Sequence, residues 1–288
     1  LVNPMFSLCQ VDLQNGLIAF YPFTGNANNV VSNSLHGVLK GDITPAIDRF
    51  GNYGSAYHFN GINTNIVVKD LGTLSNPAFS VCYYFKAEQY GLQVIAGKIN
   101  FEDGNAATFN SGVFYGGDNI FFGTMNSLND CQKKVPSTFV YTIKSNLAVS
   151  LNQWYCVVKT FEKGVERIYI NGMLVSEESL PFSDATYCTN TDFIIGSWWK
   201  DDPWWFKGVV DDVRLYDRAI TEEEVKVLCS IEDTKFSIAG DSIICKGGSV
   251  QLNAFGALSH TWSPSETLNN SGISNPVATP FVSTTYYL

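Results

Sequence analysis

The sequence predicts an all-β fold in which two sheets pack face to face. Segments rich in β-branched and aromatic residues recur along the chain and are bounded by Gly, Asn or Pro, a pattern typical of strands. An Asn171-Gly172 pair separates two such segments and predicts a hairpin with a type I′ turn, because both central residues of that turn need positive φ. Only residues 222–228 combine helical periodicity with helix caps.

The composition limits the classes of function. The 288 residues are 45% hydrophobic and carry a formal net charge of −9. Binding to nucleic acid or to an anionic membrane is not expected, because phosphate groups require clustered Lys and Arg. No apolar run approaches the roughly 18 residues of a membrane span. Because the chain begins at Leu1 rather than Met, we expect that a leader has been removed and that the protein is secreted or displayed on the cell surface.

Residues 1–15 are predicted to be a lead-in to the first strand. An Asn-rich loop is expected at 24–37, and short strands with long connections are expected across the Gly- and Asn-rich residues 100–123. The clearest predicted strands of the first domain are 16–23, 56–59, 65–68, 79–86, 92–98, 154–161, 166–170, 193–195 and 209–216.

The stretch 193–228 holds the most informative local patterns. Its first strand breaks at Gly196 into a loop with four of the chain's six tryptophans. Its second strand leads into the helix, for which Thr221 is the predicted N-cap and Glu224 completes a capping box, with Ile220 and Val225 as a hydrophobic staple. Strict alternation along 209–216 would place Asp211 on the inner face with three aliphatic residues, which are Val209, Val213 and Leu215.

This stretch resembles the closing part of the laminin-G-like, concanavalin A-like (pentraxin-like) jelly-roll family. An apolar strand ending in Gly, a variable loop, an acidic-Val-Arg-aliphatic-Tyr strand and a Thr-Glu-Glu-Glu helix occur there in the same order. Three more stretches match, which are Gly16–Asn29, Ser55–Val68 and Trp154–Val175. The resemblance covers about residues 12–229 and implies a two-sheet jelly-roll sandwich over residues 16–230.

A short polar linker is expected at 231–235, followed by a second, small β-domain at 236–288. This domain resembles the immunoglobulin-like or PKD-like repeats of Bacteroidetes-type surface proteins, through Cys245, the Trp262-Ser263-Pro264 strand and the Asn275-Pro276 stretch. The resemblance implies that Trp262 is the core tryptophan. The segment is about half of the roughly 100 residues of an immunoglobulin-like sandwich. Either the domain continues beyond Leu288 or its missing strand is supplied elsewhere, and we expect further domains of the same polypeptide.

The seven cysteines allow up to three disulfides and one free thiol. Cys82 and Cys156 lie inside predicted strands, where a buried thiol and a disulfide are both reasonable interpretations. In the fold implied by the resemblance the first and last strands are neighbours. The single pair that we expect on that basis is Cys9 with Cys229.

The resemblance also raises the possibility of a Ca²⁺ site. The family often has an Asp in the loop after the first strand, where this chain has Asn29, and Asp211 could be a second ligand. The loss of one carboxylate weakens this hypothesis. The alternative is that Asp211 accepts hydrogen bonds from backbone N–H groups of the loop.

The tryptophan loop is the candidate ligand site. Four indoles within eight residues are difficult to bury completely, so we expect at least two to be exposed, where they can stack on sugar rings or form a protein hot spot. The alternative is a hydrophobic minicore beneath a long loop. The predicted ligand-binding residues are Trp198, Trp199, Asp201, Asp202, Trp204 and Trp205.

A catalytic role is not expected. Polysaccharide hydrolases with this fold carry several carboxylates on one short Glu-x-Asp-x-Glu-like strand, and no such strand occurs here. The three histidines, at positions 36, 58 and 260, are far apart in sequence and lie in no catalytic motif. We therefore expect a non-catalytic, lectin-like module that binds a glycan. The alternatives are a structural or adhesive module that binds a surface protein within a modular fibre, and a glycoside hydrolase of the same fold.

Overall fold

The structure is a computed structural model, and it describes residues 11–69, 71, 78–104, 106–114, 119–125, 140–185, 188–189, 191–229, 237–239, 247–255, 261–273 and 275–287. The chain divides into two compact units, Leu1–Cys229 and Ser230–Leu288. Each unit is described by itself below. None of the helices in the described part of the chain has the length and apolar character that a membrane crossing requires.

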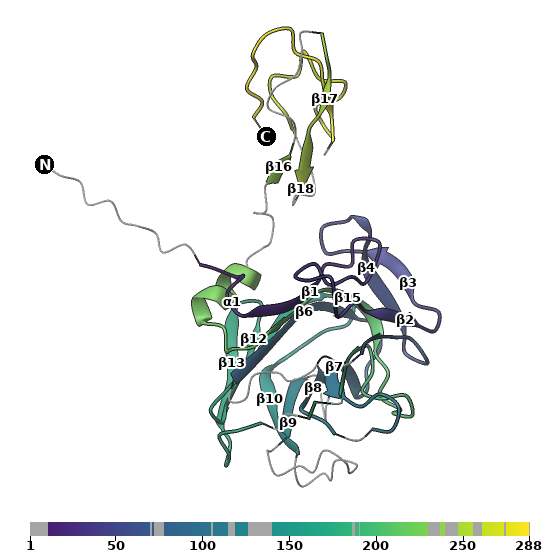
Figure 1. Ribbon diagram of the computed structural model, residues 1–288, viewed down its shortest axis with the longest axis vertical. Helices are drawn as coiled ribbons and strands as arrows, with labels where there is room; N and C mark the ends of the chain where they lie inside the picture. The colour runs from purple at the N-terminus through teal and green to yellow at the C-terminus, as the bar shows by residue number, and fades with distance from the viewer. Residues whose placement is uncertain are drawn as a thin grey trace, which may run out of the picture. The chain divides into compact units, whose positions relative to one another are not determined.

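Unit 1 is built from two antiparallel sheets, which form the two layers of a sandwich (Figure 1). Sheet A has the order β13 (Met173–Ser179), β12 (Val165–Ile170), β11 (Trp154–Glu162), β6 (Ala78–Ala87), β15 (Lys207–Tyr216), β4 (Tyr53–Asn60) and β3 (Thr44–Ile47), and β1 (Leu17–Tyr21) also pairs with β15. Sheet B has the order β10 (Val140–Ala148), β9 (Asn119–Met125), β8 (Phe109–Val113), β7 (Gln93–Ile99), β14 (Asp192–Ile195), β5 (Asn65–Val68) and β2 (Val38–Lys40). The predicted all-β sandwich is therefore confirmed.

The main core lies between the two sheets and is rich in aromatic rings. Tyr83 and Phe85 point into it from sheet A, whereas their neighbour Tyr84 belongs to a second cluster on the outer face of the same sheet. From sheet B, Phe109 stacks on Phe79 with ring centroids 5.3 Å apart. The period of two along each strand thus gives each sheet one face toward the core and one face away from it.

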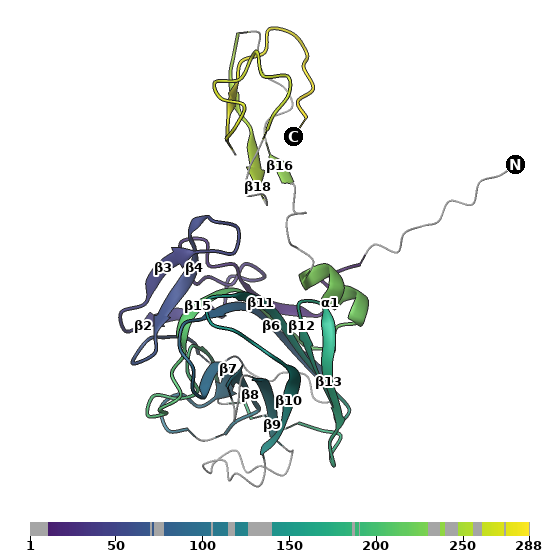
Figure 2. The same ribbon diagram turned by 180° about the vertical axis from the view of Figure 1, so that it is seen from behind.

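The helix α1 (Glu222–Cys229) covers part of the outer face of sheet A and lies beside β11 to β13 in both views (Figures 1 and 2). Its predicted start is confirmed. The Glu224 N–H donates to Thr221 Oγ1 at 3.2 Å, and the Thr221 N–H donates to Glu224 Oε2 at 2.6 Å, which is the expected capping box. Ile220 and Val225 are both buried in the cluster beneath the helix.

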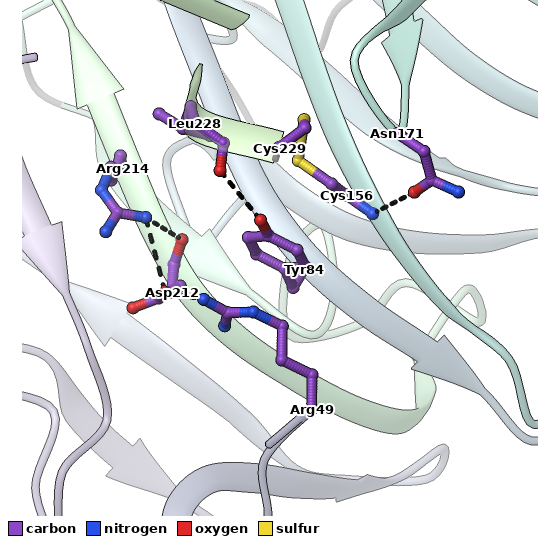
Figure 3. The surroundings of a disulfide bond; sticks show 8 residues. All are labelled: Arg49, Tyr84, Cys156, Asn171, Asp212, Arg214, Leu228 and Cys229. Atoms are coloured by element: carbon purple, nitrogen blue, oxygen red, sulfur yellow. Dashed lines mark hydrogen bonds and ion pairs between the residues drawn. A yellow bond between two sulfur atoms is a disulfide. The ribbon is translucent and has the colours of Figure 1, made fainter. Parts of the chain in front are cut away.

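The predicted hairpin is confirmed at the β12–β13 turn. Asn171 and Gly172 have φ of +50° and +81°, as a type I′ turn requires. The Asn171 side chain also accepts a hydrogen bond from the Cys156 N–H at 2.9 Å, so the turn is tied to β11 (Figure 3).

The expected alternation along β15 is wrong at Asp211. The pairing of β15 with β6 shifts between Asp211 and Arg214, and Asp212 has φ of +50°, so a bulge resets the phase of the strand. As a result Val210, Val213 and Leu215 point into the main core. Asp211 is buried, with 3% exposure, but on the outer face of sheet A beside Tyr84, with which it pairs.

The expected Cys9–Cys229 disulfide is also wrong. Cys229 is bonded to Cys156, so the end of α1 is joined covalently to the middle of sheet A (Figure 3). Cys9 itself lies outside the described residues. Cys188 is disulfide-bonded as well, and Cys82 is a buried free thiol.

Unit 2 contains two small two-stranded sheets, β16 (Ser237–Ala239) with β18 (Asn253–Phe255) and β17 (Val250–Gln251) with β19 (Val277–Ala278). Trp262 is buried against Leu252 and Ala278, and its Nε1 donates to the Ile273 carbonyl at 2.9 Å. Trp262 is thus a core residue, as expected. The predicted linker at 231–235 and Cys245 lie outside the described residues.

Candidate ligand-binding site

The tryptophan loop, residues 197–205, leaves sheet B at the end of β14 and returns to sheet A at the start of β15. Its base is closed by backbone hydrogen bonds. The Gly196 N–H donates to the Ile95 carbonyl, and the Phe206 N–H donates to the Gly196 carbonyl, both at 2.8 Å. A side chain at Gly196 would collide with the Phe59 ring, and its φ of +96° favours glycine, so this position fixes the turn. Phe206 is buried in the main core, as predicted.

The loop folds back onto the outer face of sheet B. Trp198 and Trp199 pack against a cluster that includes Val67, Ile99 and Phe101. The rings of Trp198 and Trp204 lie 6.1 Å apart at an interplanar angle of 40°. The loop is thus held by sheet B along its length and does not extend freely into solvent.

Each of the four indole side chains is half-buried. This state lies between the exposed indoles and the buried minicore that the sequence left open. The expectation that at least two are exposed is not met, and neither is that of a closed minicore. Trp199 lies over Gly104, whose missing Cβ would be 2.7 Å from the indole ring. Trp205 is half-buried at the end of the loop, next to the buried Phe206.

The two aspartates of the loop have different roles. Asp202 has only 6% exposure, and its Oδ1 accepts a hydrogen bond from the Trp204 N–H at 2.6 Å. Its Oδ1 therefore holds the turn before Trp204. Asp201 and Lys200 are exposed at the loop tip.

An ion-pair network joins Lys200 of the loop to charged residues of other segments. Lys69 Nζ is 2.9 Å from Asp192 Oδ2 and 3.7 Å from Glu102 Oε1, and Lys200 Nζ is 3.7 Å from Glu102 Oε2. The hydrogen bond to Asp192 raises the pKa of Lys69. This network brings together strand ends that are far apart in sequence, so no local pattern could have predicted it.

The two residues proposed as calcium ligands do not fit a metal ion. Asp211 Oδ2 is 2.6 Å from Arg49 Nη1, so a cation already occupies its open side. Asn29 uses its carboxamide oxygen to accept the N–H groups of Phe20 and Val31, both at 3.0 Å, within its own loop. Among the described residues no group of three or more His, Cys, Asp or Glu side chains could hold a metal ion. The alternative of backbone N–H donors from the loop is replaced by the Arg49 ion pair.

Comparisons with known proteins agree with this architecture. The family model described as the concanavalin A-like lectin/glucanases superfamily, Laminin_G_3, matches residues 60–226, more than half of the chain. A search of curated proteins gave no match.

Several solved structures share the fold at low sequence identity. Domain 4 of an extracellular arabinanase of family GH43 from Geobacillus stearothermophilus, in complex with arabinotriose, has a TM-score of 0.58 and 22% identity, over 74% of this chain and 98% of that one. The binding domain of Paraclostridial Mosquitocidal Protein 1 has a TM-score of 0.57 and 13% identity, over 84% of this chain and 64% of that one. The receptor-binding domain of botulinum neurotoxin D has a TM-score of 0.56 and 14% identity, over 80% of this chain and 56% of that one.

These neighbours are mostly binding domains, and at such identities they establish the fold alone. The family model covers more than half of the chain and agrees with the observed jelly-roll sandwich. The chain belongs to the concanavalin A-like lectin/glucanases superfamily.

Proposed function

We propose that unit 1 is a non-catalytic carbohydrate-binding module and that its ligand contacts the tryptophan loop. The observation that carries the proposal is the half-buried state of the four indoles on a loop with a closed base. A half-buried ring keeps one part fixed by packing and presents another part to a ligand, so little side-chain entropy is lost on binding. The exposed Lys200 and Asp201 add a donor and an acceptor for hydroxyl groups.

Two further observations support this proposal. The arabinanase domain of similar fold is in complex with arabinotriose, a neutral oligosaccharide. The Cys156–Cys229 disulfide is typical of oxidising compartments, which supports a secreted or surface-displayed protein.

Calorimetric titration of the full chain with arabinotriose, and affinity electrophoresis in gels that contain soluble plant or host polysaccharides, test the proposal. We expect Trp199→Ala and Trp204→Ala each to weaken binding by about tenfold or more, because stacking sites need several rings acting together. The melting temperature should change little.

Trp154→Ala is the matched control. Trp154 is also a half-buried indole of unit 1, but it lies at the start of β11 in sheet A, with Lys86 Nζ 5.3 Å from its ring centroid. It should leave affinity unchanged. If instead the two loop variants lower stability by several kcal/mol, as expected for buried aromatic residues, the loop is a minicore and the ligand site lies elsewhere. Hydrolysis of any polysaccharide on the panel, abolished by a single carboxylate substitution, would contradict a non-catalytic role.

A protein-interaction module is the second candidate, and one observation favours it. Exposed apolar side chains gather on the edge strands β2 and β3 and their adjoining loops, which is unusual for a surface without a partner. These residues are Val30, Val31, Val38, Leu39, Ile47, Tyr53 and Ile62. Binding of a protein partner that is lost in Leu39→Lys or Ile47→Lys, but retained in Trp199→Ala, would favour this candidate over carbohydrate binding.

A further inference from the structure

The outer face of sheet A carries charged side chains where β4, β15 and β6 lie side by side. His58 of β4 pairs in register with Val209 of β15, which pairs with Lys86 of β6. Their strand neighbours Phe59 and Phe85 point into the main core, so His58 and Lys86 face away from it. Both are half-buried. They can therefore be reached from solvent.

Lys207 and Glu88 extend this surface toward the tryptophan loop, which ends two residues before Lys207. The Glu88 N–H donates to the Lys207 carbonyl at 3.0 Å, so the two residues lie opposite each other, two positions beyond Val209 and Lys86 on the same face. Lys86 is thus a diagonal neighbour of Lys207, about 7–8 Å away. One small anionic group can contact both ammonium groups at that spacing. We call Lys86, Lys207, His58 and Glu88 the charge cluster.

Glu88 pairs with the histidine rather than with a lysine. Its Oε2 is 2.9 Å from His58 Nε2, and this contact crosses β15, which separates β6 from β4 in the sheet. The two side chains have 30% and 33% exposure. Within the described part of the chain, neither Lys86 nor Lys207 has a carboxylate oxygen within 4.0 Å. His58 thus holds the facing carboxylate away from the two ammonium groups.

We propose, on the basis of the carbohydrate-binding function above, that the charge cluster is a subsite for the anionic group of an acidic saccharide. Lys86 and Lys207 donate hydrogen bonds to the carboxylate or sulfate oxygens of the ligand. His58 is a positioning residue, because it withholds Glu88, which would otherwise neutralise the lysines. In a chain of net charge −9, two neighbouring lysines without a carboxylate partner complement an anion.

Calorimetric titration of the full chain with three probes tests the subsite. Trigalacturonate carries carboxylates, a sulfated galactan oligosaccharide carries sulfates, and arabinotriose is neutral. We expect the wild type to bind at least one acidic probe, and the probe that binds identifies the anionic group. Lys86→Gln and Lys207→Gln should each weaken that binding by about tenfold, the loss expected for one charge-assisted hydrogen bond. Neither should change the affinity for arabinotriose.

Lys163→Gln is the matched control for the lysine variants. Lys163 is an exposed residue of the β11–β12 turn, at the other end of β11 from Trp154, which adjoins Lys86. The substitution removes the same charge at a distance from the cluster. We expect it to bind the acidic probes as the wild type does, which separates direct contact from the general effect of net charge.

The role of His58 is tested by a pair of variants. His58→Ala should weaken binding of the acidic probe by about threefold, because Glu88 is released and can pair with the facing Lys207. The double variant His58→Ala/Glu88→Gln should restore the affinity, since it removes the competing charge. A loss of affinity that the second substitution does not restore would contradict the positioning role of His58.

The subsite and the proposed function fail in different ways. If the wild type binds arabinotriose but neither acidic probe, or if Lys86→Gln and Lys207→Gln bind the acidic probe normally, the subsite is overturned and the proposed function is intact. If the acidic probe binds through the lysines while no neutral saccharide binds, the subsite is supported and the role of the tryptophan loop is overturned. If no saccharide binds, both are overturned.

Discussion

The Arg49 guanidinium lies over the ring of Tyr84, with its central carbon 3.8 Å from the ring centroid. The Phe50 ring also contacts this guanidinium, at 4.2 Å. Two of its nitrogens reach Asp211 Oδ2 at 2.6 Å and Asp212 Oδ2 at 2.7 Å. One cation thus contacts two adjacent carboxylates at the bulge of β15. Figure 3 shows Arg49 beside Tyr84 and Asp212. Burial and then the Asp212 carboxylate raise the pKa of Asp211, and Arg49 opposes this rise.

Arg49→Met should destabilise unit 1 by about 3 kcal/mol at pH 7, because it leaves the buried Asp211 carboxylate without its cation, whereas Asp212 is half-buried and keeps Arg214 at 3.7 Å. The loss should be smaller near pH 4, since without Arg49 the raised pKa of Asp211 increases further and the proton neutralises the group. Urea unfolding at both pH values measures the difference. Arg167→Met is the control, because the Arg167–Glu177 pair is partly exposed and should be worth less than about 1 kcal/mol. An equal loss in the two variants would contradict the role of Arg49.

The Cys156–Cys229 disulfide closes a loop with a sequence separation of 73. The double variant Cys156→Ala/Cys229→Ala should have a free energy of unfolding about 4 kcal/mol lower than the wild type, which is the loop-closure entropy expected for that length. Cys82→Ala removes a buried sulfur without opening a loop and should cost about 1 kcal/mol. Burial raises the pKa of Cys82 to about 12, so peptide mapping after alkylation of the folded protein should find Cys82 unmodified.

Glu166 on β12 is fully buried between the sheets, near Lys159 of β11 and Thr124 of β9. Burial raises the pKa of Glu166 to about 8, from an ordinary value of 4.5, while Thr124 and Lys159 oppose the rise and Glu178 adds to it. The folded protein therefore holds this proton more tightly than the unfolded chain. The resulting stabilisation is complete below about pH 4.5 and is lost as the pH rises toward about 8.

Glu166→Gln tests this linkage, because glutamine does not titrate. The free energy of unfolding of the wild type should fall relative to that of the variant between about pH 5 and pH 8, by at most about 1.4 kcal/mol per pH unit. Burial lowers the pKa of Lys159, which has the opposite dependence on pH, but Lys159 is present in both proteins. A difference in stability that stays constant over this range would show that Glu166 is already ionised in the fold.

Gly104 sets the position of Trp199. It has φ of +69°, and an added Cβ would be 2.7 Å from the indole ring. Gly104→Ala should shift the indole, change the tryptophan fluorescence and weaken saccharide binding. Gly25→Ala carries a similar backbone strain at φ of +78° with nothing within 4 Å of the added Cβ. It should lower stability by about 1 kcal/mol and leave fluorescence and affinity unchanged.

Features that depend on residues a few positions apart could be predicted from the sequence. The turn at Asn171-Gly172 and the capping box of Thr221 and Glu224 follow from backbone chemistry that the residues carry wherever they occur. The all-β class and the family could be predicted for the same reason, because the strand patterns repeat along the chain.

Features that depend on tertiary structure could not be predicted. The inward direction of Asp211 rested on unbroken alternation, and a bulge at Asp212 has no clear signal in sequence beyond the tolerance of aspartate for positive φ. The partner of Cys229 is a strand residue far away in sequence.

The bond between Cys156 and Cys229 also determines how the sandwich responds to mechanical pulling. Cys229 is the last residue of α1, and Cys156 lies in β11, which is hydrogen-bonded to β6 on one side and to β12 on the other. Tension applied to the chain beyond Cys229 therefore enters the protein through the sulfur bridge at an interior strand. This force bypasses the helix, which cannot be unwound from its end while the disulfide is intact. Under reducing conditions the same force acts on α1 directly and unfolds it first.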